Sequence, residues 1–329
     1  SKLQFGLIWV GTDDGEIWVT ESAGQSWQDV DQDLPAKRWV SRVEASQFKR
    51  ERAYISLNGY RNDDIRAYVY RTDDLGKTWI DISKGLPAEA VNVIREDPVN
   101  EQVVYVGTDR GIYVSLDRGD SWQALDSKLP NVAVHDLVIH PRDRELVAGT
   151  HGRSAWVVDV LPIQELTEDV RNSATHVFYV DDISASRSWR SRRSPWFYDP
   201  ERDPPVTIHY WSQSAGDGTL EILDEEERVL RRIDLSAQAG INRVTWDRLI
   251  DQELALTAEQ AMNQDKEELS PKDQPIQQAL DLGYPLYVLP GDYQLRISIN
   301  GESGMGKVKV KAPQAYRSRA QAKAEMRGK

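Results

Sequence analysis

The chain has 329 residues, with 41 basic and 53 acidic side chains and no cysteine. The net charge of −12 argues against nucleic-acid binding, which needs a basic face to neutralise phosphates. Without cysteine there is no disulfide scaffold, no thiol nucleophile and no cysteine-ligated zinc. No apolar run approaches the ~20 residues needed to span a bilayer, so we expect no membrane insertion. The length predicts two domains.

An octapeptide occurs three times in the first half of the chain. Its pattern is Ser/Thr-x-Asp-x-Gly-x-Ser/Thr-Trp, except that Ser22 replaces the Asp in the first copy. We expect the Asp to accept turn hydrogen bonds, the Gly to adopt a positive φ and the Trp to pack between sheets. These positions are Ser22, Gly24 and Trp27, then Asp74, Gly76 and Trp79, then Asp117, Gly119 and Trp122.

The spacing of these repeats predicts the fold of the first domain, residues 1–165. The three tryptophans lie 52 and 43 residues apart, a period typical of four-stranded propeller blades. Short β-branched and aromatic runs separated by turn residues mark the strands, most clearly at 91–96, 103–106, 112–115 and 121–125. Residues 1–30 supply three strands, 37–83 and 90–126 two full blades, and 132–160 three more strands. The fold class is therefore all-β, beginning with a partial β-propeller of about three and a half blades.

The octapeptide resembles the Asp-box, or BNR, repeat of sialidases, xyloglucanases and sortilin-type receptors. The stretches 91–98 and 134–153 resemble the C-terminal part of large bacterial proteins described as BNR-repeat or sortilin-like glycosyl hydrolases. The resemblance covers residues 1–165 strongly and the remainder weakly. It implies an extracellular, cell-surface or periplasmic location and a structural role for the Asp box.

An array of three and a half blades has open ends, which expose strand edges and apolar faces. We therefore expect that missing N-terminal blades, or another chain, complete the propeller. A four-bladed ring closed within this chain is the competing interpretation.

The second domain, residues 166–313, is predicted to be an immunoglobulin-like or fibronectin-like β-sandwich. A short exit helix or linker at 161–166 precedes it. Seven runs with strand character follow, a number typical of such sandwiches. They lie at 176–180, 206–212, 219–224, 228–235, 241–246, 293–299 and 307–311.

Two charged segments interrupt or follow this pattern. The acidic insertion 251–281 holds eight acidic and two basic residues, and its composition favours a short helix over 257–268 followed by a proline-containing excursion. The basic tail 314–329 shows no apolar stripe, and we expect a fraying helix or a tail there.

Two loops are candidate binding sites. The longer loop of the second blade carries Arg61, Asp63 and Asp64, although a loop closed by its own Asx turns is the simpler explanation. An arginine- and tryptophan-rich loop could stack on sugars and pair with carboxylates, but we favour a plug between the domains. Its candidate residues are Arg187, Trp189, Arg190 and Trp196.

Other chemistry is less well supported by the sequence. His135, His140 and His151 lack the spacing of a metal-ligand set and read as turn and strand-end residues, so no metal is predicted. No phosphate loop, nucleophile elbow or HExxH motif indicates a cofactor or another catalytic centre. Carboxylates that could serve glycoside hydrolysis are numerous, but their spacing selects no pair. They are Asp13, Asp14, Asp63, Asp64, Asp109 and Asp136.

Three functions remain open. The leading interpretation is a binding or assembly portion of a secreted or cell-surface propeller protein, not catalytic by itself, with a polysaccharide or a peptide as ligand. The second is the C-terminal part of a polysaccharide-acting glycoside hydrolase whose catalytic carboxylates lie largely outside this chain. The third is a sortilin-like receptor domain that binds peptides.

Overall fold

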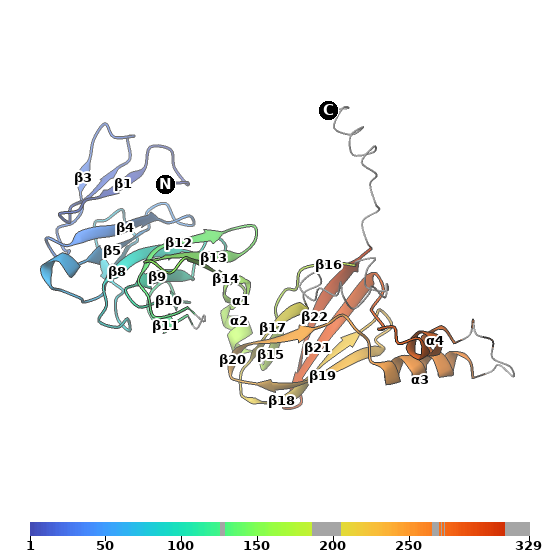
Figure 1. Ribbon diagram of the computed structural model, residues 1–329. Coiled ribbons are helices and arrows are strands. Elements are labelled where there is room, and N and C mark those ends of the chain that lie inside the picture. Colours follow the sequence, from blue (N-terminus) through green and yellow to red (C-terminus); the bar gives the residue numbers. More distant parts are fainter. Residues whose placement is uncertain (126–128, 186–204, 265–269, 271, 273, 313–329) are drawn as a thin grey trace. The chain divides into compact units, whose positions relative to one another are not determined.

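The computed structural model describes residues 1–125, 129–185, 205–264, 270, 272 and 274–312 (Figure 1). Most of the regular structure consists of short antiparallel strands, so the chain is an all-β protein as predicted. The chain forms two compact units, Ser1–Leu166 and Thr167–Lys329.

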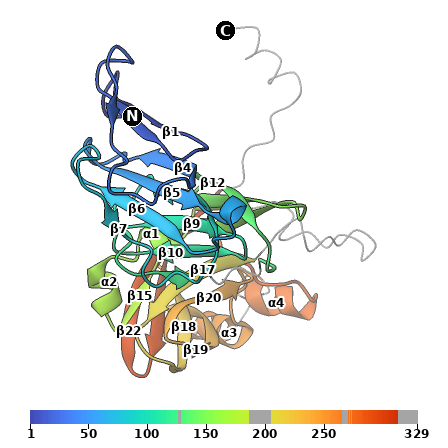
Figure 2. The same cartoon turned by 90° about the vertical axis from the view of Figure 1, so that its left-hand side faces the viewer.

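The first unit is a partial β-propeller of four successive antiparallel sheets, or blades (Figures 1 and 2). The first blade contains β1 (Ile8–Gly11), β2 (Ile17–Thr20) and β3 (Gln28–Asp29). The second contains β4 (Trp39–Ala45), β5 (Ala53–Asn58), β6 (Tyr68–Thr72) and β7 (Ile80–Asp81). The third contains β8 (Val91–Glu96), β9 (Val104–Thr108), β10 (Ile112–Ser115) and β11 (Gln123–Ala124). The fourth contains β12 (Val134–His140), β13 (Glu145–Thr150) and β14 (Ala155–Asp159), and α1 (Leu161–Gln164) follows it, so the exit helix is confirmed.

The apolar core of this unit lies between the blades. One cluster joins the first and second blades around Val30 and Val40, and another joins the second and third around Ile82 and Val91. A third joins the last two blades around Val134. Each blade therefore depends on its neighbours for burial, as in other repeat proteins.

The octapeptide forms the hairpin between the third and fourth strands of a blade. Asp74 accepts hydrogen bonds from the backbone N–H and the hydroxyl of Thr78, at 2.9 and 2.7 Å. Asp117 holds Ser121 in the same way. Gly76 and Gly119 have φ values of +81° and +98°, which a residue with a Cβ rarely adopts. The first copy lacks the carboxylate, and Ser22 contacts Ser26 with its hydroxyl at 3.0 Å.

The repeat tryptophans connect each blade to the one before it. Trp79 Nε1 donates to the carbonyl of Val30, at 2.7 Å, and Trp122 Nε1 donates to the carbonyl of Ile82, at 2.6 Å. The octapeptide glycines lie against the same two residues, because a Cβ on Gly119 would come within 3.0 Å of Ile82 Cβ. One indole hydrogen bond and one close glycine contact thus recur at the first two of the three junctions.

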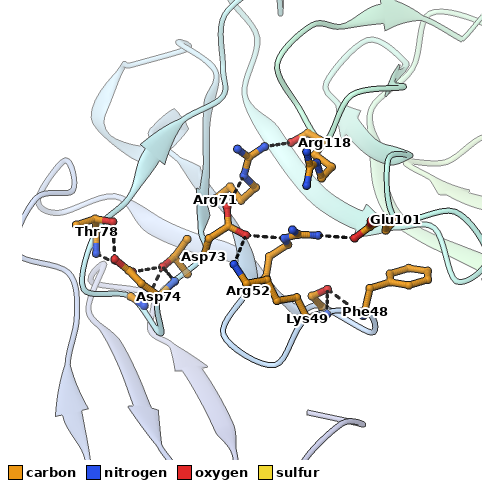
Figure 3. A network of polar contacts seen from close by, with 12 residues as sticks. Phe48, Lys49, Arg52, Arg71, Asp73, Asp74, Thr78, Glu101 and Arg118 are labelled. Carbon is orange, nitrogen blue, oxygen red and sulfur yellow. Dashed lines mark hydrogen bonds and ion pairs between the residues drawn. The ribbon is translucent and has the colours of Figure 1, made fainter. Parts of the chain in front are cut away.

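An ion-pair network adds a second connection between the second and third blades (Figure 3). Arg52 is almost fully buried and contacts Asp73 on its own blade and Glu101 on the next, at 2.7 and 3.2 Å. Arg71 contacts Asp73 as well and donates to the carbonyl of Arg118 on the third blade. Because Arg52 has carboxylate partners on both sides, its burial leaves no unpaired charge.

The described residues of the second unit form two sheets. Their orders are β15-β17-β20 and β16-β22-β21-β18-β19, and all pairings are antiparallel except β16 with β22. The strands are β15 (Thr175–Val177), β16 (Ile183–Ser184), β17 (Val206–Ser212), β18 (Gly216–Leu223), β19 (Val229–Ala237), β20 (Gly240–Trp246), β21 (Gly291–Ile299) and β22 (Glu302–Lys311).

One hydrophobic core joins these two sheets. Ile208 and Trp246 come from the first sheet, and Leu220 and Leu295 come from the second. The seven predicted strands are present, and Ile183–Ser184 is an eighth that the sequence pattern did not indicate. The immunoglobulin-like or fibronectin-like assignment stays a prediction.

The acidic insertion differs from the prediction. Its helix α3 spans Gln252–Met262, so it begins five residues before the predicted start, and residues 265–269 lie outside the described part. The excursion that follows contains a second helix, α4 (Pro275–Asp281), which was not predicted. Pro275 occupies the first turn of α4, where its missing N–H costs no hydrogen bond, so this proline begins a helix.

The contact between the octapeptide glycine and the preceding blade gives a direct test of blade packing. Gly119→Ala should destabilise the first unit by about 2–4 kcal/mol, because the new Cβ meets Ile82 and the backbone is in the left-handed region. The matched control is Gly111→Ala, since a Cβ at Gly111 meets nothing within 4 Å. Urea unfolding followed by tryptophan fluorescence measures both. Equal costs for the two substitutions would contradict the packing role.

Candidate functional site

The inner strands of three blades share an irregularity next to a pocket. A β-bulge interrupts the pairing of β4, β8 and β12 near the start of each strand, at Ser41, Asn92 and His135. Bulges commonly redirect side chains beside binding sites. Asn92 and His135 line the pocket, whereas the Ser41 hydroxyl donates to the carbonyl of Val91, at 2.8 Å.

This inner-strand pocket has a volume of about 480 Å³. Its residues come from two corresponding regions of successive blades, the start of the inner strand and the end of the strand that pairs with it. They are Trp39, Asn58, Tyr60, Arg61, Asn92, Asp109, Ala133, His135 and His151.

Two buried amides form the polar floor of the pocket. Asn58 Nδ2 donates to Asn92 Oδ1, at 2.9 Å, and Asn92 Nδ2 donates to Asp109 Oδ1, at 3.0 Å. Asn58 Oδ1 also accepts from the backbone N–H of Tyr60. The second and third blades are therefore joined at the pocket by a chain of hydrogen bonds, which fixes the orientation of both amides.

Aromatic and basic groups form the more exposed part of the pocket. The Arg61 guanidinium lies over the ring of Trp39, 5.2 Å from its centroid. The rings of His135 and His151 meet edge to face, with centroids 5.3 Å apart. Trp39 and Tyr60 keep 37% and 68% of their surface exposed, so both rings can contact a ligand.

The loop residues Arg61, Asp63 and Asp64 separate in the structure. Arg61 lines the pocket, Asp63 caps the short 3₁₀ helix η1 (Tyr60–Asn62), and Asp64 faces three partners of its own. Asp64 Oδ2 accepts from Arg38, Arg66 and Tyr68, at 2.9, 2.8 and 2.6 Å. These bonds, that of Arg66 foremost, hold the pKa of Asp64 well below its usual range.

The inner strands also carry a charge cluster. Arg95 contacts Glu44 at 2.7 Å and Asp136 at 3.2 Å, and Arg42 pairs with Asp136 as well. Burial raises the pKa of Glu44, and the neighbouring Arg95 opposes this rise. Asp136 and Asp64, two of the carboxylates considered for catalysis, are therefore held in ion pairs.

The sequence did not predict that His135 and His151 would meet. The two residues belong to different strands, and only the pairing of β12 with β13 brings them to one rim of the pocket. His135 lies near the start of β12, and His151 directly follows the end of β13. Antiparallel pairing places these two positions side by side, so the predicted hairpin could have indicated the contact. Within the described ranges, no group of three or more His, Asp or Glu side chains is placed to hold a metal ion.

The remaining candidates cannot be placed. Arg187, Trp189, Arg190 and Trp196 belong to residues 186–204, which lie outside the described residues, as does the basic tail 314–329.

In the second unit, a separate apolar pocket of about 450 Å³ lies beside α3 and α4, and Leu230, Ile250 and Leu254 are among its lining residues.

The hydrogen bonds of Asp64 predict a pH-dependent contribution to stability. A carboxyl group whose pKa is lowered in the folded state stabilises the fold above its unperturbed pKa of 3.8 and loses this effect as the pH falls. Asp64→Asn should lower the thermal midpoint at pH 7 by about 2–6 °C. The difference from the parent chain should shrink below about pH 4. Calorimetry across this range measures it, and a difference independent of pH would contradict the assignment.

Comparison with known proteins supports a propeller-like chain. Residues 67–184 match the family described as Sortilin, neurotensin receptor 3. No curated protein matches the sequence significantly. Among the helices of the described residues, none has the length and apolar character needed to cross a membrane.

Several solved structures resemble the chain at low identity. They include YCF48 bound to a D1 peptide (15% identity, 69% of this chain and 63% of that one, TM-score 0.34). A GH74 xyloglucanase from Xanthomonas campestris is 11% identical and covers 92% of this chain and 45% of its own, with a TM-score of 0.39. PorZ, a surface component of the type-IX secretion system of Porphyromonas gingivalis, is 14% identical and covers 92% and 38%, with a TM-score of 0.30. The chain thus spans less than two thirds of each of these proteins.

Proposed function

We propose that this chain is the binding portion of an exported propeller protein and that the inner-strand pocket binds a polysaccharide. The observation that carries the proposal is the composition of the pocket. Two exposed aromatic rings, Trp39 and Tyr60, lie beside buried amides and a pair of imidazoles. Aromatic rings stack on the apolar faces of sugars, and amides and imidazoles exchange hydrogen bonds with their hydroxyl groups.

The size and rigidity of the pocket support a binding role. A volume of about 480 Å³ lies within the range of about 300–1,000 Å³ that is usual for ligand pockets. Asn58 and Asn92 are 5% and 7% exposed and already hydrogen-bonded to each other, so their remaining groups are held in place before a ligand arrives. Preorganisation of this kind reduces the entropy lost on binding.

A peptide or another ligand with a carboxylate is the second candidate. Arg61 favours it, because its guanidinium stacks on Trp39 at the pocket and can pair with a carboxylate through two parallel hydrogen bonds. A uronic-acid polysaccharide would satisfy both Arg61 and the aromatic rings. Acidic sugars therefore belong in the binding assay beside neutral ones.

The pocket gives less support to hydrolysis. Cleavage of a glycosidic bond generally needs two carboxyl groups about 5–10 Å apart. Among the described residues that line the pocket, Asp109 is the one carboxylate, and its Oδ1 accepts a hydrogen bond from Asn92. A hydrolase would need a second carboxylate from another part of the complete propeller.

An extracellular, cell-surface or periplasmic location is part of the proposal. The match of residues 67–184 to the sortilin family supports it. A polysaccharide ligand is also consistent with a protein that works outside the cytoplasm.

Trp39→Ala should weaken polysaccharide binding by tenfold or more, about 1.4 kcal/mol, because it removes the ring that forms one side of the pocket. Affinity electrophoresis against neutral and uronic-acid polysaccharides identifies the ligand, and calorimetry then measures the affinity of the variant.

The matched control is Trp156→Ala, since Trp156 is 38% exposed, nearly as much as Trp39, and does not line the pocket. Equal losses for the two tryptophans would argue against the pocket. Release of reducing sugar by the chain, abolished in Asp109→Ala, would instead favour the hydrolase.

A further inference from the structure

The first two of the three junctions between successive blades repeat one set of contacts. On the later blade, the octapeptide contributes a tryptophan and a glycine. On the earlier blade, an aliphatic residue just after the outermost strand accepts the indole hydrogen bond and covers the glycine. Val30 has this role towards Trp79 and Gly76, and Ile82 has it towards Trp122.

Among the described residues, the later half of this junction has no partner at the first blade. Trp27 is 42% exposed, and a Cβ on Gly24 would meet only the Trp27 ring itself, at 3.8 Å. Ile8 and Val10, on the face of β1 turned away from the second blade, are 42% and 39% exposed. The residues that pack against the preceding blade at the first two internal junctions are therefore in place here but uncovered.

The inner strands supply a second set of contacts at each junction. Gly107, on β9, lies so close to β12 of the next blade that a Cβ would come within 2.8 Å of Val134. Gly11 is in the same position against Val40 and Val43 of β4. At the junction between these two, Ser56 replaces the glycine and contacts Ser41, which donates to the carbonyl of Val91.

At the fourth blade, the glycine half of this inner-strand contact has no partner in the part of the chain that the structure describes. Gly149 corresponds to Gly107 in the strand register, yet a Cβ there would meet only Asp136 of the same blade, at 3.7 Å. Val138, Val147 and Val157 are directly paired across the three strands, so they form one apolar row on a single face. Val138 and Val157 are 53% and 58% exposed.

From these contacts we infer that both ends of the four-blade array are half-junctions, each completed by a further blade of the same repeat. The preceding blade supplies an aliphatic residue after its outermost strand, which accepts a hydrogen bond from Trp27 and covers Gly24. The following blade supplies an inner strand that places a β-branched residue against Gly149.

A second copy of the chain fits less well. At the two junctions that have this hydrogen bond, its acceptor directly follows the outermost strand of the earlier blade, β3 or β7. Between residues 129 and 166, all of which are described, β14 is followed by α1 and no fourth strand forms. The last blade of a copy therefore lacks the acceptor that Trp27 requires.

The internal repeat provides its own probe. Asp97 N–H donates to the carbonyl of Val103, and Ser46 N–H donates to that of Arg52. The amino group of Ser1 donates to the carbonyl of Leu7 in the same way, so Ser1 corresponds to Asp97. A copy of residues 52–96 placed directly before Ser1 of the full chain therefore continues the repeat in register. It supplies strands like β5, β6 and β7 for a preceding blade and an inner strand like β8 for the first blade.

In the extended chain, the copy of Ile82 should accept the Trp27 hydrogen bond. Trp27→Ala should then raise the unfolding equilibrium constant of the first unit in both chains. The factor of this rise should be at least about tenfold larger in the extended chain than in the parent chain. Trp156→Ala is the control, because its cost should be the same in both chains. Fluorine NMR of the chain labelled with 5-fluorotryptophan, with Trp27 assigned from Trp27→Phe, should show its signal shift on extension.

An equal cost of Trp27→Ala in the two chains, or an unshifted Trp27 signal, would overturn the inference. Concentration-dependent dimerisation of the parent chain that Trp27→Ala or Val157→Lys abolishes would do so as well, because it would identify a second copy as the occupant. A copy of residues 103–139 placed before Ser1 is a second, independent extension that keeps the same register. If neither extension adds to the folded unit, a blade of this repeat is not the partner.

Discussion

The hydrogen bond from a repeat tryptophan to the carbonyl of the preceding blade is the contact on which the first unit depends. Trp79 reaches Val30 and Trp122 reaches Ile82, and beside each bond an octapeptide glycine lies against the same aliphatic residue. Because the apolar clusters lie between blades, no blade buries its faces alone. Stability is therefore a sum of neighbouring junctions, and Arg52 adds an ion-pair connection to one of them.

The packing of neighbouring blades also brings together the residues that line the pocket. The inner strands β4, β8 and β12 are held against one another, and corresponding positions of three blades meet at one end of them. The bulges at Asn92 and His135 place polar side chains there, while farther along the strands Arg95 joins Glu44 and Asp136. A site assembled from several blades gains its rigidity from the scaffold, and the hydrogen-bonded amides of Asn58 and Asn92 need no rearrangement before they contact a ligand.

Local sequence patterns located most of the strands but not the full pocket. The propeller strands and the exit helix form where apolar runs and turn residues predicted them, because hairpins are specified by residues close in sequence. Helix α4 was missed because a proline-containing excursion was predicted there, although proline suits the first turn of a helix. Arg61 was found from the length of its loop, whereas Trp39, Asn92 and the pair His135 and His151 emerge only when separate strands are brought together.

The sequence by itself determined the repeat: its period, its turns, and the Trp and Gly that the first two junctions use. These features are local, since hydrogen bonds within eight residues shape each octapeptide turn. The tertiary structure decided which groups share a surface. It held Asp64 in ion pairs away from the pocket, joined Asn58 to Asn92 across two blades, and left Trp27 and Gly149 uncovered at opposite ends of the array. Contacts of this kind join residues tens of positions apart, so they depend on how blades stack and not on any pattern within one blade.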